Sequence, residues 1–188
     1  MQHFLFPVTD DYKRKMAHNV VLKILILGSE SVDNFKIIAD RYFSTDYKTI
    51  VGVNVLSKTI PVQHEGNRMN AVLSMWDISS KTRFEDIRKI FFKGGVGALF
   101  LFDLSNPSTW YHIIECYKEI EIAFKKIPFM VISNLHAKKK IMVNEKDVEE
   151  WVEQKGGHYI QIDMKNLTRL ESTFKKLVAE IVSINSPS

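Results

Sequence analysis

Apolar residues in the first half of the chain form short continuous runs, each about the length of one strand. Residues 20–27 are apolar except for one lysine and stop at Gly28, which is typical of a strand buried on both faces of a sheet. Residues 53–62 and 69–76 form two further runs on either side of the polar segment 63–67, and this pattern predicts a β-hairpin.

In the second half, strand-like runs alternate with longer segments whose apolar residues recur at helical spacing. Asn144 precedes one such segment as a helix N-cap, and Gly156 closes it. This alternation predicts an α/β fold with a six-stranded, mostly parallel sheet, one antiparallel strand from the hairpin, and helices on both faces. The later strands are expected at 97–103, 128–133 and 158–162, and the helices at 34–43, 108–125, 145–154 and 167–184.

The composition is typical of one globular domain, since 45% of the 188 residues are apolar and 26% are charged. Residues 20–184 carry the strand and helix pattern, between an irregular N-terminal extension, 1–19, and a short tail, 185–188. The single cysteine, Cys116, excludes an internal disulfide framework and a zinc site built from several cysteines. His112 lies four residues before it, the spacing of a metal pair on a helix, but no further ligand is nearby in the sequence.

Charge and end segments argue against nucleic-acid and membrane binding. Lys and Arg total 26 against 22 Asp and Glu, a net charge of +4, and the two signs are interleaved. The densest basic cluster, 138–140, is typical of a solvated loop. No apolar run reaches the ~20 residues of a membrane span, residues 1–9 lack a signal-peptide pattern, and residues 184–188 hold no cysteine for a prenyl anchor. We therefore expect a cytoplasmic protein without direct membrane insertion.

Four segments follow one another in the order found in one large family: 47–58, 75–84, 92–106 and 128–134. In the second of them, Trp76 and Asp77 open a stretch similar to Trp-Asp-Thr-Ala-Gly-Gln-Glu-Arg-Phe. Across residues 20–184 the chain resembles the Ras superfamily of small GTPases, with the Rab branch closest. The resemblance implies the G-domain fold of P-loop NTPases. In that fold the four segments correspond, in order, to the stretch from switch I into the second strand, the switch II motif, the fourth strand and the base-recognition strand.

The family's phosphate loop reads Gly-x4-Gly-Lys-Ser/Thr, because backbone N–H groups, a lysine and a magnesium-binding hydroxyl converge on the phosphates. In the matching segment only Gly28 agrees with this pattern. Asp33 replaces the second glycine, Asn34 the lysine and Phe35 the hydroxyl-bearing residue, whose ring could fill the phosphate pocket. The two charge units lost, at about 4 kcal/mol each, equal the binding free energy of a micromolar ligand, so we expect phosphate binding in the family manner to fail.

The switch motifs also depart from the family pattern. Asp77, which in the family supports the magnesium ion through water, is retained. Ser80 stands in place of the next glycine, and Lys81 in place of the glutamine that orients the attacking water. Ile50 falls on the switch I threonine, although Thr49 lies one place away and a shift of register would restore it. Asp77 is then either a structural remnant bonded to loop N–H groups or a residual cation site.

The first of two base-recognition motifs keeps one matching residue, Asn134. The family motif Asn-Lys-x-Asp uses its carboxylate to accept two hydrogen bonds from guanine, whereas here Leu135 follows Asn134 and Ala137 takes the place of the aspartate. Lys165 lies in the segment that reads Ser-Ala-Lys in the family. Together, the losses of phosphate, metal, water and base contacts indicate a pseudo-GTPase without catalytic residues, metal or cofactor.

Three apolar residues are candidates for partner binding. Val55, Trp76 and Phe91 match the apolar triad that forms part of the family's effector-binding face between the switches. Ordinary core packing explains the same residues equally well. Ile122 lies opposite the apolar stripe of its predicted helix, either as an exposed contact or as a stray surface isoleucine.

The sequence therefore predicts a non-enzymatic module that presents its switch-region face to a protein partner in one fixed state. The alternative is a divergent small GTPase that still binds GTP or GDP with Mg²⁺ through Asp77, Asn134 and Lys165 and hydrolyses GTP slowly. In that case Lys36 or Lys81 would supply the missing positive charge. A third hypothesis is an unrelated small-molecule role on the same fold.

Overall fold

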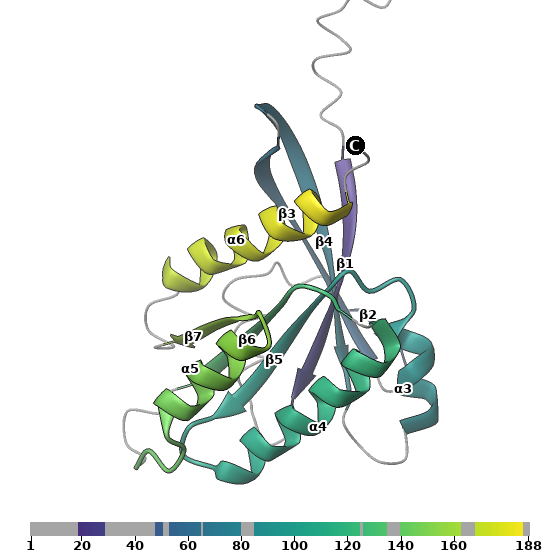
Figure 1. Cartoon of the computed structure of the whole chain (residues 1–188). Helices are drawn as coiled ribbons and strands as arrows, with labels where there is room; N and C mark the ends of the chain where they lie inside the picture. Colours follow the sequence, from purple (N-terminus) through teal and green to yellow (C-terminus); the bar gives the residue numbers. More distant parts are fainter. Residues whose placement is uncertain are drawn as a thin grey trace, which may run out of the picture.

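A central β-sheet with helices on both faces forms the framework of the protein (Figure 1). The computed structural model describes residues 19–28, 48–50, 53–64, 66–79, 85–124, 126–134, 140–162 and 168–185. The strands within them are β1 Asn19–Gly28, β2 Lys48–Ile50, β3 Val53–His64, β4 Asn67–Ile78, β5 Gly97–Asp103, β6 Phe129–Asn134 and β7 His158–Ile162. These seven described strands form one sheet in the order β2-β3-β4-β1-β5-β6-β7.

β3 is the strand of this described sheet that runs against the others, since it pairs antiparallel with both β2 and β4. The pairs β4–β1, β1–β5, β5–β6 and β6–β7 are all parallel. The predicted α/β fold with a mostly parallel sheet and one antiparallel strand is therefore confirmed. β2 adds an edge strand to the six that were predicted, because three residues are too few to show an alternating pattern in the sequence.

The predicted hairpin of β3 and β4 closes within the polar segment that separates the two apolar runs. His64 pairs with Asn67, and Gly66 between them has a φ of 78°, a left-handed conformation that glycine adopts without steric cost. The ladder runs from this turn to the pair Val53–Ile78, so both strands are longer than their apolar runs.

The helices among the described residues are α3 Glu85–Phe92, α4 Pro107–Phe124, α5 Glu145–Gln154 and α6 Thr168–Asn185. The predicted N-cap of α5 is confirmed, because Asn144 Oδ1 accepts a hydrogen bond of 3.2 Å from the Lys146 N–H. α3 was not predicted from the sequence, and the helix predicted over residues 34–43 lies outside the described residues. None of the helices that the structure describes has the length and apolar character needed to cross a bilayer.

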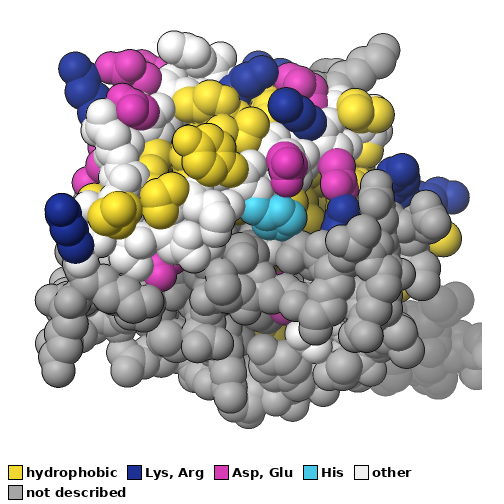
Figure 2. Space-filling view, turned by 90° about the horizontal axis from the view of Figure 1, so that it is seen from below, with side chains coloured by type: hydrophobic (Ala, Val, Ile, Leu, Met, Phe, Trp, Pro, Cys, Tyr) yellow, Lys and Arg dark blue, Asp and Glu magenta, His cyan; other side chains and the backbone are white. Residues whose placement is uncertain are grey.

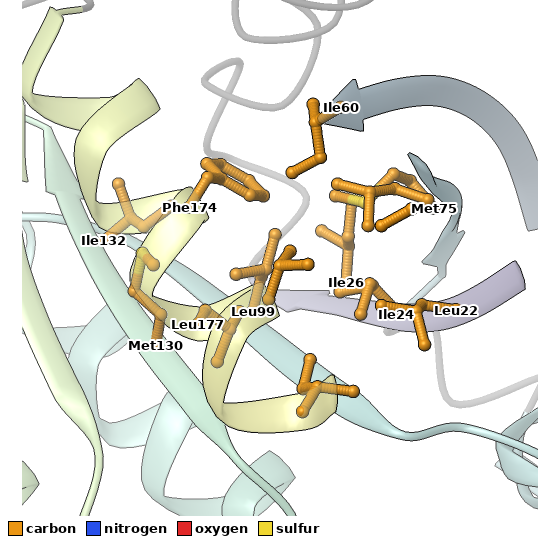
Figure 3. Packing of buried hydrophobic residues seen from close by; sticks show 14 of the residues in the cluster. Leu22, Ile24, Ile26, Ile60, Met75, Leu99, Met130, Ile132, Phe174 and Leu177 are labelled. Carbon is orange, nitrogen blue, oxygen red and sulfur yellow. The ribbon is translucent and has the colours of Figure 1, made fainter. Parts of the chain in front are cut away.

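The core has two layers, one on each face of the sheet, because side chains alternate along every strand. On β1, the side chains of Leu22, Ile24 and Ile26 belong to the layer under α6. Leu25 and Leu27 belong to the opposite layer, which α4 and α5 cover. Figure 3 shows part of the first layer, in which residues of α6 meet residues of the sheet. The predicted helices on both faces are thus confirmed.

Candidate functional site

The carboxyl ends of the parallel strands meet at one edge of the sheet, the lower edge in Figure 1. β1 lies between β4 and β5, where the strand order changes direction, and open α/β sheets bind ligands in the crevice beside such a point. Gly28 ends β1, Asp77 lies next to the end of β4, and Asn134 ends β6, so these three predicted site residues share this edge. Figure 2 looks onto the molecule from this side, where apolar side chains of the described residues lie among charged ones.

Gly28 allows β1 and β5 to approach closely. It pairs with Leu101 in the parallel ladder, and a Cβ atom added to it would lie 2.6 Å from the Leu101 carbonyl oxygen. That distance is far inside normal contact, so a larger residue would push the strands apart. Strand packing therefore explains Gly28 as well as the resemblance to a phosphate loop does.

The Asp77 carboxylate takes part in the pairing of β3 with β4. Asn54 lies directly opposite Asp77 in the ladder, and its Nδ2 donates a hydrogen bond of 3.0 Å to Asp77 Oδ2. Both residues are half-buried. Loop N–H groups were the predicted partners of a remnant Asp77, and the partner identified here is a side-chain amide on the neighbouring strand. Asn54 was not predicted as a site residue, although the register of the predicted hairpin places it opposite Asp77.

Beside Asn134, a partly buried hydrogen-bonded network joins three elements. Ser133 Oγ lies 2.6 Å from the Tyr159 hydroxyl, and that hydroxyl donates a hydrogen bond of 2.9 Å to Glu145 Oε1 in the first turn of α5. Because Tyr159 gives its only proton to Glu145, Ser133 is the donor in the other bond. Burial raises the pKa of Tyr159 above its ordinary value, and the nearby Glu145 carboxylate raises the pKa further. The network fixes the start of α5 against β6 and β7.

Asp103, at the end of β5, shapes the connection to α4. Its Oδ1 accepts hydrogen bonds of 2.8 Å from the Ser105 N–H and 2.6 Å from the Ser105 hydroxyl. Its own N–H donates to Thr109 Oγ1 at 3.0 Å. These contacts hold the turn that leads into α4, and none of them was predicted from the sequence.

Most of the other predicted site residues lie outside the described part of the chain. They are Asp33, Asn34 and Phe35 of the phosphate segment, Ser80 and Lys81 of the second switch, and Leu135, Ala137 and Lys165 of the base-recognition segments. Thr49 and Ile50 are in β2, where they pair with Asn54 and Val53 respectively. Both registers considered for the switch I threonine thus fall on the edge strand.

The three candidate partner-binding residues come together on the sheet face that α3 adjoins. Val55 pairs directly with Trp76 across β3 and β4. The rings of Trp76 and Phe91 have centroids 6.1 Å apart and are tilted by 43°. All three side chains are half-buried and pack against the core layer on this face. The Trp76 face, as we call Val55, Trp76 and Phe91, therefore combines core packing with accessible surface.

Lys23 of β1 lies over the indole ring at the centre of this face. Its Nζ is 3.8 Å from the centroid of the Trp76 ring and donates a hydrogen bond of 2.9 Å to the Lys93 carbonyl oxygen. The Trp76 Nε1 donates to Ser74 Oγ at 2.9 Å. The indole is therefore held by Lys23 over its face and by Ser74 at its N–H group. Partial burial lowers the pKa of Lys23. This role of Lys23 was not predicted, although Lys23 is the lone charge in the apolar run 20–27.

The predicted His112–Cys116 pair is real as a contact, because His112 Nε2 lies 3.4 Å from Cys116 Sγ. Burial, and next the Glu119 carboxylate, raise the pKa of Cys116 to about 12, so the thiol stays protonated at neutral pH and is a poor metal ligand. Among the residues that the structure describes, no three His, Cys, Asp or Glu side chains are grouped so as to hold a metal ion. On the same helix Ile122 is 85% exposed, as its place opposite the apolar stripe predicted.

Comparison with known proteins agrees with this architecture. The family model described as the Ras family matches residues 23–183. The Ras-related protein RABA4a of Arabidopsis thaliana is 27% identical over 174 residues, covering 87% of this chain and 73% of that protein. Rab11D of Nicotiana tabacum is 25% identical over 169 residues, covering 87% and 74%, and Rab11A of Lotus japonicus is 27% identical over 173 residues, covering 87% and 73%. Since the match spans β1 to α6, this chain belongs to the Ras family, and Rab proteins are among its relatives.

Proposed function

We propose that this chain is a Rab-like pseudo-GTPase, a protein-interaction module that neither binds nor hydrolyses GTP in the manner of its family. The observation that carries the proposal is the replacement of three phosphate-loop residues, by Asp33, Asn34 and Phe35, in a chain that retains the family sheet. We further propose a cytoplasmic location, which suits a chain whose single cysteine is a buried free thiol.

The residues present do not fit GTP with Mg²⁺. The Phe35 side chain has no oxygen for a hard cation, and Asp33 would place a negative charge among phosphate oxygens. Asp77, the remaining carboxylate of the family's metal site, accepts a hydrogen bond from Asn54. A carboxylate has about four lone-pair sites, so this bond takes up part of the capacity of Asp77 to accept a hydrogen bond from a magnesium-bound water.

The Trp76 face supports the proposed binding of a protein partner. Trp76 is aromatic, half-buried and held by Lys23 and Ser74, so little conformational entropy is lost when a partner covers it. α3 is itself anchored, because Arg88 makes two hydrogen bonds, of 2.9 and 2.7 Å, to the Glu119 carboxylate of α4. A face held in this way can act in one fixed state, without a nucleotide to order it.

Calorimetric titration of the full chain with GTP and with GDP, each with and without Mg²⁺, tests the loss of nucleotide binding. We expect no heat of binding, and no nucleotide in mass spectra of the purified protein. The matched variant carries Asp33→Gly, Asn34→Lys and Phe35→Thr, which rebuild the phosphate loop. We expect it to stay inactive in binding, because Leu135 and Ala137 still remove base recognition. Micromolar binding by the natural chain would refute the proposal.

Residual nucleotide binding is the second candidate function. The observation that favours it is that Gly28, Asp77 and Asn134 still share the carboxyl edge of the sheet. On this alternative the titration gives a dissociation constant in the micromolar range or below, and Asp77→Ala weakens it.

Site-specific photo-crosslinking in the cell of origin tests the partner face. A crosslinking amino acid at Phe91 is expected to yield a discrete adduct of higher mass, while the same amino acid at Ile122 is not. Ile122 is a matched control because it is highly exposed on α4 and lies outside the Trp76 face. Equal adducts at both positions, or none at Phe91, would contradict the proposal.

A further inference from the structure

Beyond the Trp76 face, part of the sheet carries side chains that no described helix covers. Along β1, β3 and β4 the alternation that places Leu25, Trp76 and Val55 on one face continues toward the hairpin end. Each strand contributes its next two residues on that face. We call these six residues the Val21 strip: Val21 and Lys23 of β1, Val72 and Ser74 of β4, and Ser57 and Thr59 of β3.

The Val21 strip is accessible to solvent at Val21, whereas the opposite face of the same strands is buried. Val21 is 68% exposed, although β1 pairs in parallel with β4 and parallel sheets are normally covered on both faces. On the reverse side Leu22, Ala71 and Ile60 are at most 4% exposed in the layer under α6. Figure 1 shows the reason, since α3, α4 and α5 lie toward the other end of these strands.

We propose that residues 4–8 of this same chain, Phe-Leu-Phe-Pro-Val, dock on the Val21 strip. They are five consecutive apolar residues, and they lie outside the described part of the chain. Burying apolar side chains against Val21 and Val72 removes both surfaces from water, which is the driving force for the contact. This inference holds whether or not the chain binds a nucleotide.

The length of the connection permits the contact. β1 begins at Asn19, two residues before Val21, so the chain enters the sheet beside the strip. The ten residues 9–18 can span up to about 33 Å, while three adjacent strands are only about 10 Å across. A short tether also gives the segment a local concentration in the millimolar range, so weak apolar contacts suffice.

Charge adds to the fit. Lys23 supplies the positive charge within the strip, and Asp10 and Asp11 follow the apolar segment after one residue, Thr9. An ammonium group has three donors, so Lys23 can bind a carboxylate while it keeps its bond to the Lys93 carbonyl. Residues 13–15 are basic and lie closer to β1 along the chain. The acidic residues that can pair with Lys23 are therefore in the first half of the connection.

The first experiment measures how fast a small thiol reagent modifies Val21→Cys in the full chain, read by mass spectrometry at residue 21. We expect the rate to rise about tenfold or more when Phe4→Ser and Phe6→Ser are added, because a docked state populated at about 90% shields the thiol. Ile122→Cys serves as control, and its rate should be the same with and without those two changes. Equal rates at residue 21 in both backgrounds would overturn the proposal, as would shielding that depends on protein concentration, which indicates a second copy.

A second measurement leaves the sheet unaltered. Millisecond deuterium uptake by residues 4–8 of the natural chain is expected to be slower than in the Phe4→Ser, Phe6→Ser variant, because docking restricts access of water to the backbone. Uptake at the rate of an unprotected peptide in the natural chain would refute the docking, whatever the thiol variants do.

Discussion

The side-chain amide of Asn54 donates a hydrogen bond of 3.0 Å to the Asp77 carboxylate, directly across the β3–β4 ladder. Asp77 is the residue that the resemblance assigns to a magnesium site, yet in this chain it is also part of the sheet. Because the bond uses one of its carboxylate oxygens, the contribution of Asp77 to folding can be measured separately from any contribution to ligand binding.

A double-mutant cycle on this pair should give a coupling free energy of about 1 kcal/mol or more, since hydrogen bonds to charged groups contribute about 1.5–3 kcal/mol and this one is partly exposed. The variants are Asn54→Ala, Asp77→Ala and the double change, compared by urea unfolding. Asp77→Asn, which retains an oxygen acceptor, should lose less stability than Asp77→Ala. A melting temperature of the natural chain that rises with Mg²⁺, and no longer rises in Asp77→Ala, would instead identify a cation site.

The Arg88–Glu119 pair should respond unequally to loss of its two partners. Arg88 has 6% of its side chain exposed and Glu119 has 27%, so only the carboxylate can recover water when its partner is removed. We expect Glu119→Ala to cost about 3 kcal/mol, because it strands a buried guanidinium, and Arg88→Met to cost about 1 kcal/mol. Chemical denaturation of both variants checks this order.

The same pair should matter to the Trp76 face. Phe91 lies three residues after Arg88 on α3, and its ring meets Trp76. Near-ultraviolet circular dichroism, which reports ordered aromatic rings, should weaken in Glu119→Ala while the far-ultraviolet spectrum stays native. An unchanged aromatic signal would mean that other contacts hold α3.

Stability should fall at alkaline pH through Tyr159. Its pKa in the folded protein is raised above the ordinary value of 10.0, chiefly by burial, so above pH 10 the folded state holds a proton that the unfolded state loses. The stabilisation is complete below pH 10 and is lost as the pH rises toward the folded pKa.

Tyr159→Phe isolates this effect. The variant should be less stable by about 1–2 kcal/mol at pH 7, through loss of the bonds to Ser133 and Glu145. It should also show a shallower decline in unfolding free energy between pH 9 and pH 11. Parallel pH profiles for the variant and the natural chain would show that Tyr159 ionises equally in both states.

Cys116 should be inert in the folded protein. With its pKa raised to about 12, the thiolate fraction at pH 8 is about one in ten thousand, so alkylation should be about 1,000-fold slower than in the urea-unfolded chain. The measurement is the rate of thiol modification with and without urea. Rapid modification of the native chain would mean that α4 opens, or that the thiol is ionised.

The order of strands and helices followed from the sequence because each has a clear apolar period. β5 and β7 begin and end where predicted, and α5 coincides with its predicted span and N-cap. β2 and α3 escaped prediction for a physical reason. β2 has three residues and α3 has only eight, including the buried, charged Arg88, so both are too short for their apolar period to stand out from the neighbouring sequence.

For the site, the sequence by itself determined which chemical groups this chain possesses. The sequence alone gives the residues that occupy the motif positions, and their charges can be compared with the family pattern without coordinates. These residues are Asp33, Asn34 and Phe35 in the phosphate segment and Leu135 and Ala137 in the base segment. The family resemblance rested on the same order of motifs, and it was confirmed over residues 23–183.

Only the tertiary structure decided which of those groups meet. Lys23 reaches Trp76 from another strand 53 positions away in the chain, Arg88 binds Glu119 between two helices, and Tyr159 joins Ser133 to Glu145. Such contacts depend on sheet order, register and helix packing, which bring together residues that no local period connects. The exposure of Val21 likewise depends on the tertiary structure, because α3, α4 and α5 cover the other end of its sheet.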